Sequence, residues 1–264
     1  MKFFNVIAAA GLALGLAACS QQAQKQELTF VQYNVGVFAK YDSSSVEAVA
    51  AAVREMGAVA VTLNELDSCT SRTGNVDQLA AFADEMGGWS HHYAAAMPYK
   101  GGAYGVGVAA APELKVVRTD RIALPKLDGY EPRAVSVVEF EDFVLCSTHL
   151  DLTLESQLGQ VEVINQYMDS VYVESDKPVF LGGDFNCEPD SEPVAVLKQT
   201  WELLTPVTFS YPSDAPCKCI DFIFVRPQGR KVEVVSTEIP ATLKTADLAT
   251  ASDHLPVMLK VTIE

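Results

Sequence analysis

Acidic side chains and histidines close several short apolar runs of this 264-residue chain. They are four carboxylates and two imidazoles: Glu65, Asp184, Asp221, Asp253, His149 and His254. An ionised carboxylate beside a buried strand is costly unless it is paired or bound to a cation. A single Asp after a strand is more simply a turn residue or a helix cap. Several such ends that converge would instead favour a site for a divalent ion.

The donor atoms of these side chains indicate which ions and ligands would fit. All-oxygen ligands select hard ions such as Mg²⁺, Mn²⁺ or Ca²⁺ over zinc. The amides of Asn34 and Asn186 add neutral donors and acceptors, which suit phosphate oxygens or an attacking water. Together these groups would suit a hard divalent ion that acts on a phosphate oxygen or a water, with Mg²⁺ as the expected ion and Mn²⁺ or Ca²⁺ as alternatives.

The elements that must position these residues alternate between strand and helix patterns, as in an α/β fold. A strand over 28–37, a helix over 46–56 and a strand over 59–63 form a crossover unit that delivers Asn34 and Glu65. The remaining expected elements are strands at 104–110, 114–118, 133–140, 143–149, 178–181, 220–225, 231–236 and 255–263, and helices at 76–86 and 154–173. No Pro-, Gly- or Ser-rich linker divides the chain after residue 27, so one domain over 28–264 is expected.

Composition and motifs exclude several classes of protein. Hydrophobic residues make up 49% of the chain and charged residues 20%, a balance that can bury a core and is unlike that of a disordered chain. The net charge of -15 argues against binding to polyanions through bulk charge. A phosphate substrate must therefore be bound locally, most simply through metal ions. The chain has neither the G-x-S-x-G turn of a serine hydrolase nor the H-E-x-x-H of a zinc peptidase.

The first residues have the pattern of an export signal. Lys2 precedes an apolar stretch over 3–18, and Cys19 and a polar run follow it. This is a secretory signal, and it is marginal as a membrane span, which needs about 20 apolar residues. Its end, Leu-Ala-Ala-Cys, resembles the lipobox of a bacterial lipoprotein. The resemblance implies a signal peptide over 1–18, a lipidated Cys19 with a linker over 19–27, and an exported protein anchored to a bacterial membrane. An ordinary signal peptide with a chance Cys is the alternative.

Six segments resemble, in order, the motifs of the endonuclease/exonuclease/phosphatase superfamily, which includes DNase I-like nucleases, inositol-polyphosphate 5-phosphatases and bacterial sphingomyelinases. The segments are Tyr33-Asn34-Val35, Asn64-Glu65-Leu66-Asp67, Ser147-Thr148-His149-Leu150-Asp151, Gly183-Asp184-Phe185-Asn186, Ile220-Asp221-Phe222-Ile223-Phe224-Val225 and Ser252-Asp253-His254-Leu255-Pro256-Val257. The resemblance spans residues 28–262. One departure is visible, because Asn64 stands where the family usually has Gln before the metal-binding Glu.

This resemblance implies a DNase I-like, four-layered α/β sandwich, two mixed sheets packed face to face with helices outside. It also implies roles for the residues at one rim of the sheets. Glu65 would be the principal metal ligand, with Asn34 and Asp253 near the same ion or a second one. Asp184 would orient or deprotonate the attacking water, and Asn186 would hold that water or a phosphate oxygen. The remaining three act on the phosphoryl group and the leaving group: His254 paired with Asp221, and His149.

Three functional classes remain open. The first is a divalent-metal-dependent phosphoesterase that acts on a small or lipid-linked phosphate mono- or diester. The second is a nuclease of the same family that works outside the cytoplasm, and the third is a catalytically silent binding domain. The acidic charge and the absence of a basic stripe favour the small substrate, so nucleic acid is an open but less favoured partner.

Several further residues have a supporting role or an open one. Arg133 is a candidate partner of a phosphate or of a site acid, and an ordinary ion pair explains it equally well. Asp67 and Asp151 are expected to be supporting residues rather than metal ligands. The glycine-containing stretch 94–107 is a candidate for the substrate entrance. Five cysteines follow Cys19, and an exported location leaves open a disulfide among the last three: Cys187, Cys217 and Cys219.

Overall fold

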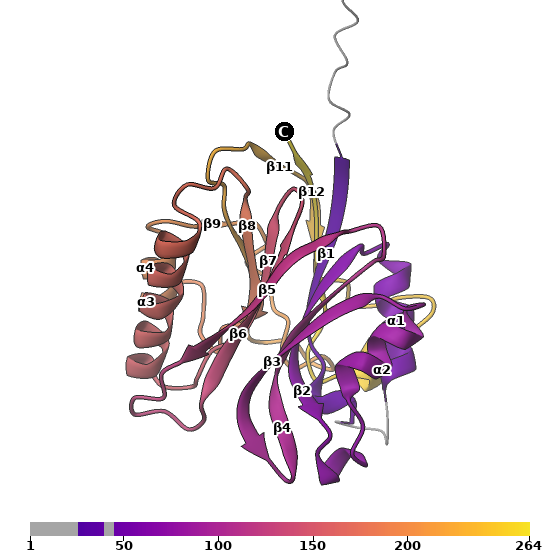
Figure 1. Ribbon diagram of the computed structural model, residues 1–264. Coiled ribbons are helices and arrows are strands. Elements are labelled where there is room, and N and C mark those ends of the chain that lie inside the picture. The colour runs from indigo at the N-terminus through magenta and orange to yellow at the C-terminus, as the bar shows by residue number, and fades with distance from the viewer. Residues whose placement is uncertain (1–25, 40–44) are drawn as a thin grey trace, which may run out of the picture.

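A computed structural model of the protein describes residues 26–39 and 45–264. The expectations for the signal peptide, for Cys19 and for the linker up to residue 25 concern residues outside that range. Two six-stranded sheets pack face to face, and helices cover both outer faces (Figure 1). The four-layered α/β sandwich implied by the motifs is therefore confirmed.

The strands follow a mixed order in each sheet. The first sheet contains, in spatial order, β11 (Val232–Glu238), β12 (Val257–Ile263), β1 (Gln26–Asn34), β2 (Ala60–Ser68), β4 (Gly102–Ala110) and β3 (Ser90–Tyr99). The second contains β5 (Val116–Leu124), β6 (Arg133–Phe140), β7 (Val144–His149), β8 (Val179–Asp184), β10 (Asp221–Arg226) and β9 (Glu202–Leu203). The pairs β1–β2 and β7–β8 are parallel, so their carboxyl ends lie at one edge.

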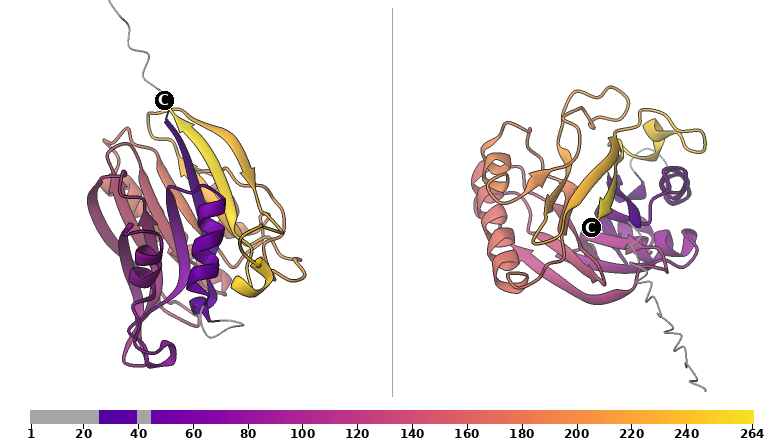
Figure 2. Two further views of the ribbon diagram at one scale, coloured as in Figure 1. Left: turned by 90° about the vertical axis from the view of Figure 1, so that its right-hand side faces the viewer. Right: turned by 90° about the horizontal axis from the view of Figure 1, so that it is seen from above.

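The helices form the two outer layers, and the view from above in Figure 2 shows them on either side of the sheets. On the first sheet lie α1 (Val46–Glu55), α2 (Gln78–Glu85) and the short α5 (Leu248–Ala251), and on the second lie α3 (Leu154–Val171) and α4 (Glu192–Leu197). Two 3-10 turns, η1 (Gly36–Phe38) and η2 (Ser71–Thr73), follow β1 and β2. Within the described residues, no helix combines the length and the apolar composition that crossing a bilayer requires.

Alternation along β1 explains how the fold places polar groups between the sheets. Val31 and Tyr33 belong to the apolar cluster under α1 and α2, whereas Leu28 and Phe30 belong to the cluster between the sheets. Because successive side chains of a strand point to opposite faces, Asn34 continues the inner face of Leu28 and Phe30. Asp184 on β8, Asp221 on β10 and His149 on β7 lie on the inner face for the same reason. Each is an even number of positions from a residue of the inner cluster on its own strand: Phe180, Ile223 and Leu145, respectively.

The layer between the sheets is therefore apolar at one end and polar at the other. Phe30 packs against Phe180 and Phe143 with ring centroids 4.8 and 5.1 Å apart. Toward the other end, Gly182 of β8 faces Thr62 of β2, and a Cβ at Gly182 would lie 2.4 Å from the Thr62 Oγ1. The absence of a side chain at Gly182 lets the sheets approach closely just before the strands deliver their polar ends.

Some sequence expectations were incomplete. The strand expected at 114–118 extends to Leu124, and β3 was not expected, because its apolar residues are mainly alanines and its burial is partial along its length. No disulfide joins the last three cysteines, since all five cysteines in the described part of the chain are free. Cys219 packs in the buried cluster beneath α4 while Cys217 is exposed, so these two side chains face different surroundings.

Candidate active site

The polar end of the inter-sheet layer opens into a cleft of about 700 Å³. Six of the eight residues predicted to form the site line this cleft: Glu65, His149, Asp184, Asn186, Asp253 and His254. Asn34 and Asp221 lie directly behind it, hydrogen-bonded to Asp184 and His254 respectively. Residues separated by as many as 220 positions thus meet at one edge of the two sheets. Their chemical roles remain predictions.

Two of these side chains depend on unusual backbone conformations. Glu65 has φ 56° and Asn186 has φ 51°, in the left-handed region that non-glycine residues rarely adopt. Glu65 sits where the pairing of β2 with β4 shifts register between Leu63 and Leu66, a bulge that redirects its side chain. Strained conformations of this kind are concentrated at functional sites, and both residues line the cleft.

Asp184 is at the centre of the site. Its Oδ2 accepts a hydrogen bond from Asn34 Nδ2 at 3.0 Å and lies 3.5 Å from His149 Nε2 and 3.7 Å from His254 Nε2. Its Oδ1 accepts from the backbone N–H of Asn186 at 2.9 Å. Burial and the neighbouring charge of Asp221 raise the pKa of Asp184 to about 7. The carboxylate is therefore poised to accept a proton near neutral pH.

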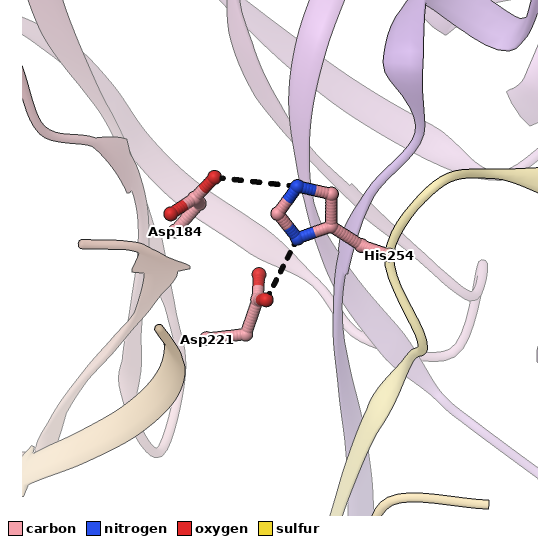
Figure 3. A group of neighbouring side chains, drawn as sticks. All are labelled: Asp184, Asp221 and His254. Carbon is pink, nitrogen blue, oxygen red and sulfur yellow. Dashed lines mark hydrogen bonds and ion pairs between the residues drawn. The ribbon is translucent and has the colours of Figure 1, made fainter. Parts of the chain in front are cut away.

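His254 lies between two carboxylates, as Figure 3 shows. Its Nδ1 is 2.8 Å from Asp221 Oδ2, and its Nε2 faces Asp184. The Ser210 hydroxyl donates to the same Asp221 oxygen at 2.6 Å, which fixes that carboxylate. Burial lowers the pKa of His254, but the charges of Asp221 and Asp184 and the hydrogen bond to Asp221 outweigh burial and raise the pKa to about 9. His254 is therefore an imidazolium at neutral pH, held by Asp221.

His149 has the opposite electrostatic environment. Burial, followed by the positive charges of Arg133 and His254, holds the pKa of His149 well below its usual range, so the ring is neutral. Arg133 Nη1 lies 3.2 Å from Nδ1, and Asn186 Nδ2, which also donates to Leu150 O, lies 2.9 Å from Nε2. Asp184 Oδ2 lies 3.5 Å from the same Nε2. His149 is thus a neutral imidazole at the cleft, with an N–H donor of another residue facing each of its ring nitrogens.

The donor set fits a hard divalent ion. Arg72 pairs with Asp67, and Arg133 pairs with Glu131, so these two ion pairs add no net charge to the cleft. The four remaining carboxylates, Glu65, Asp184, Asp221 and Asp253, are opposed only by His254 and by Lys218 at the rim. Burial first, and then the negative charge of Asp221, raises the pKa of Asp184, so the second of these causes reflects the excess of carboxylates. A cation would relieve it.

The residues predicted to bind the ion differ from the residues that form the tightest cluster of acids and histidines. Among the described residues, the one group of three acids and histidines whose ligand atoms lie within 4.8 Å of one another is Asp184, Asp221 and His254. In that group His254 is already hydrogen-bonded to Asp221, so the arrangement is a proton-binding chain as much as a metal cluster. Glu65 Oε1 lies 3.2 Å from Asn34 Nδ2, which also donates to Asp184. This oxygen-rich group, with Asp253, remains the predicted ion site.

Sequence reasoning missed the residues that lock the two sheets together behind the cleft. Gln32 donates to Asn64 Oδ1 at 2.5 Å and to Asp221 Oδ1 at 3.3 Å. The Asn64 amide donates to Thr148 O at 2.7 Å and accepts from the backbone N–H of Asp184 at 3.0 Å. Asn64, noted as a departure from the family pattern, is therefore a fully buried clamp between sheets. Gln32 could have been found from its parity, because it lies two residues before Asn34.

The supporting residues behave as expected. Asp67 is fully buried and accepts from Arg72 and Thr70, and Asp151 accepts from the backbone N–H groups of Tyr130 and Leu152. Arg133 forms an ion pair with Glu131 at 3.3 Å, and its buried Nε has no hydrogen-bond partner. The ion pair supports one interpretation of Arg133, and its position on the cleft wall beside His149 leaves the other, contact with a phosphate, open.

Two sheets with an acidic, histidine-containing rim define a DNase I-like hydrolase fold, and comparison with known proteins specifies the family. The Endonuclease/Exonuclease/phosphatase family matches residues 31–254, so the chain belongs to that family. Its members are divalent-metal-dependent phosphatases and nucleases.

Solved structures share the fold at low sequence identity. A family member from Bacteroides vulgatus has a TM-score of 0.76 at 19% identity, covering 91% of this chain and 100% of that one. A mannosyl-6-phosphatase from Bacteroides thetaiotaomicron has a TM-score of 0.73 at 17% identity, covering 90% and 99%. The human nocturnin catalytic domain, with bound sulfate, has a TM-score of 0.68 at 14% identity, covering 91% and 97%. No protein of curated function matches the sequence.

Proposed function

We propose that the protein is a divalent-metal-dependent phosphoesterase that hydrolyses a small phosphate ester, with Mg²⁺ as the expected ion. The observation that carries this proposal is the convergence of eight acids, amides and histidines on one cleft whose carboxylates exceed its cations. A phosphate cannot approach such a cleft unless its charge is neutralised. When bound, the ion would neutralise phosphate oxygens and acidify water; Asn34, Glu65 and Asp253 would hold it.

The residues of the chain suit the remaining steps. A water molecule would attack phosphorus, the bond from phosphorus to the leaving oxygen would break, and the leaving oxygen would take up a proton. Asp184 would orient the water and accept its proton, helped by the raised pKa, and that proton would return to the leaving oxygen directly or through solvent. The imidazolium of His254 would stabilise charge on the phosphoryl oxygens. His149 would assist the departure of the leaving oxygen as a hydrogen-bond donor, and Asn186 would hold the water or a phosphate oxygen.

Arg133 is the best candidate for a direct phosphate contact by a cation of the chain. It is 5% exposed, lines the cleft, contacts His149 and keeps a buried Nε donor without a partner. A phosphate oxygen in the cleft beside His149 would meet the positive charge of this guanidinium. This contact would place the phosphoryl group beside His149.

A small substrate is favoured over nucleic acid. Binding to a polyanion relies on several basic side chains that contact successive phosphates, whereas the cations at this cleft are few and two of them are paired with acids. The relative named as a mannosyl-6-phosphatase supports the same choice. A nuclease activity outside the cytoplasm remains the alternative, and a silent binding domain is disfavoured because every predicted catalytic side chain lies at the cleft or directly behind it.

We also propose that Cys19 carries a lipid anchor and that the cleft faces away from the membrane. The described chain enters the fold at Gln26, which pairs with Ile263 at the end of the sheet opposite to Asn34 (Figure 1). The nine residues of β1 separate these ends by about 27 Å. Tethering at the Gln26 end would present the cleft to solutes rather than to the anchoring bilayer, which favours a soluble substrate over a lipid-linked one.

A panel assay tests the proposed function. Purified residues 20–264 would be incubated with sugar phosphates, inositol phosphates, nucleotides, plasmid DNA, RNA, sphingomyelin vesicles and chromogenic mono- and diesters, with Mg²⁺ and with EDTA. We expect EDTA-sensitive hydrolysis of small soluble esters. Cleavage of DNA without activity on any small ester would overturn the choice of substrate.

A further inference from the structure

A second group of side chains at the cleft lies outside the proposed reaction machinery. Arg72 lines the cleft and is about a third exposed. Its Nε and Nη2 donate to the two oxygens of Asp67 at 2.6 and 2.8 Å. Asp67 is fully buried and is held in turn by the hydroxyls of Thr70 and Thr73. The guanidinium is therefore fixed through one edge, in the fork geometry that a carboxylate supports.

Two tyrosine rings lie against the same guanidinium in cation–π contacts. The Arg72 Cζ lies 4.4 Å from the ring centroid of Tyr99 and 5.6 Å from that of Tyr104. These tyrosines belong to the β3–β4 hairpin, whose turn residues Lys100 and Gly101 both have positive φ, as a tight two-residue turn requires. A Cβ at Gly102 would lie 2.1 Å from the Ser68 carbonyl, so the hairpin sits directly against β2. The expectation that stretch 94–107 borders the substrate entrance agrees with this placement.

The charge of Arg72 is neutralised within the group. Burial would raise the pKa of Asp67, but the hydrogen bonds from Arg72 and Thr70 outweigh it and lower that pKa, so the carboxylate stays ionised opposite the guanidinium. An arginine neutralised in this way is a weak site for another phosphate. It retains N–H donors in a fixed position, which suit neutral acceptors.

The group adjoins the expected position of the phosphate. Tyr104 lies between Arg72 and Arg133, and Arg133 contacts His149, the predicted donor to the leaving oxygen. A leaving group bonded to that oxygen would extend across Tyr104 toward Arg72. The wall it meets offers aromatic faces, phenol hydroxyls and guanidinium N–H groups. Because the cleft already carries excess negative charge, a leaving group with further anionic groups would be repelled.

We propose that Arg72, positioned by Asp67 and Tyr99, determines specificity by binding hydroxyl groups of a sugar or other polyol leaving group. The assignment rests on the proposed phosphoesterase function and names its substrate class. Hydroxyls both donate and accept hydrogen bonds, and the C–H faces of a sugar ring pack on tyrosine rings. A site built to hydrogen-bond substrate hydroxyls discriminates strongly against analogues that lack them.

The test compares substrates with and without hydroxyls in the leaving group. Hydrolysis of mannose 6-phosphate, glucose 6-phosphate, myo-inositol 1-phosphate and p-nitrophenyl phosphate would be measured with Mg²⁺ for the native protein, Arg72→Met and Tyr99→Leu. We expect Arg72→Met to lower kcat/KM for the preferred polyol phosphate by about 10- to 100-fold, mainly through KM, and to leave p-nitrophenyl phosphate within about twofold. Arg54→Met is the matched control, since Arg54 forms an exposed pair with Glu85.

Binding is measured in parallel by calorimetry with the same polyol phosphates, so the two proposals can fail separately. Binding that depends on Arg72 in a protein that hydrolyses no ester would support the subsite and overturn the phosphoesterase function. Two results would overturn the subsite. One is an equal loss of kcat/KM for polyol and nitrophenyl esters in Arg72→Met, and the other is a native protein that neither binds nor prefers any of the polyol phosphates. If Arg72→Met does not fold, Tyr99→Leu gives the same comparison.

Discussion

The two walls of the cleft differ in how their charges are balanced. The catalytic wall gathers Glu65, Asp184, Asp221 and Asp253 from separate strand ends, and burial together with the charge of Asp221 raises the pKa of Asp184. The opposite wall pairs Arg72 with Asp67 five residues away and covers the guanidinium with a hairpin tyrosine. One wall carries charge that only an added cation can balance, whereas the other is neutral as folded.

This difference separates chemistry from recognition. The catalytic wall needs an ion, and electrostatic preorganisation of this kind usually provides the largest catalytic contribution. The neutral wall needs none and can select a leaving group through hydrogen bonds and ring faces. Changes on the first wall should therefore alter turnover for every substrate and couple to metal, while changes on the second should alter selectivity.

The largest effect is expected on turnover when the catalytic wall loses a group. Asp184→Asn removes the proposed proton acceptor, and His254→Ala removes the imidazolium held by Asp221. Each should lower kcat by at least about a hundredfold for all substrates. His91→Ala and Asp142→Asn, both exposed, are controls in the same steady-state assay. Near-native turnover of either site variant would refute the role assigned to that residue.

Metal should stabilise the catalytic wall specifically. Binding of Mg²⁺ at a hundred times Kd adds about 2.7 kcal/mol to the free energy of unfolding, which corresponds to roughly 5–10 °C in Tm for a chain of this size. Differential scanning calorimetry should show this rise for the native protein and for Arg72→Met, and a much smaller one for Glu65→Gln. An equal rise in all three would place the ion elsewhere.

Arg133 lies where the catalytic wall meets the wall around Arg72, and the effect of its substitution shows whether it binds the phosphate or the leaving group. If its guanidinium binds the phosphate, Arg133→Met should lower kcat/KM by about tenfold or more for polyol and nitrophenyl esters alike. Arg118→Met, an exposed arginine of β5, is the control. A loss confined to polyol esters would instead assign Arg133 to leaving-group recognition.

The smallest effect concerns the stability of the metal-free protein. The folded pKa of Asp184, about 7, lies above its unfolded value, so the folded state binds more protons and loses stability as pH rises toward 7. Above pH 7 the carboxylate is ionised, and without metal its buried negative charge lowers the free energy of unfolding by the full amount. Asp184→Asn should therefore raise the Tm of the EDTA-treated protein at pH 8 by a few degrees, about 1 kcal/mol, and by less at pH 5. A lower Tm at pH 8 would contradict this electrostatic account.

Strand and helix patterns predicted an α/β chain because the periodicities that bury apolar faces are visible in the sequence, whereas the two-sheet sandwich was implied by the resemblance of the motifs to a known family. Val59 to Leu63, for example, lead directly into Asn64 and Glu65. The motif order identified which acids and amides would meet. Elements with weak patterns were missed, notably β3, because alanines in a partly exposed strand give little signal.

The sequence by itself determined the α/β class, since strand and helix periodicities are local properties. Its six motifs, through their resemblance to a known family, implied the two-sheet arrangement and identified the acids, amides and histidines at the strand ends. Only the tertiary structure decided the protonation of His149 and His254, the clamp formed by Gln32 and Asn64 between the sheets, and the neutral wall around Arg72. Those features depend on burial and on distances between residues far apart in the chain, and no local pattern encodes either quantity.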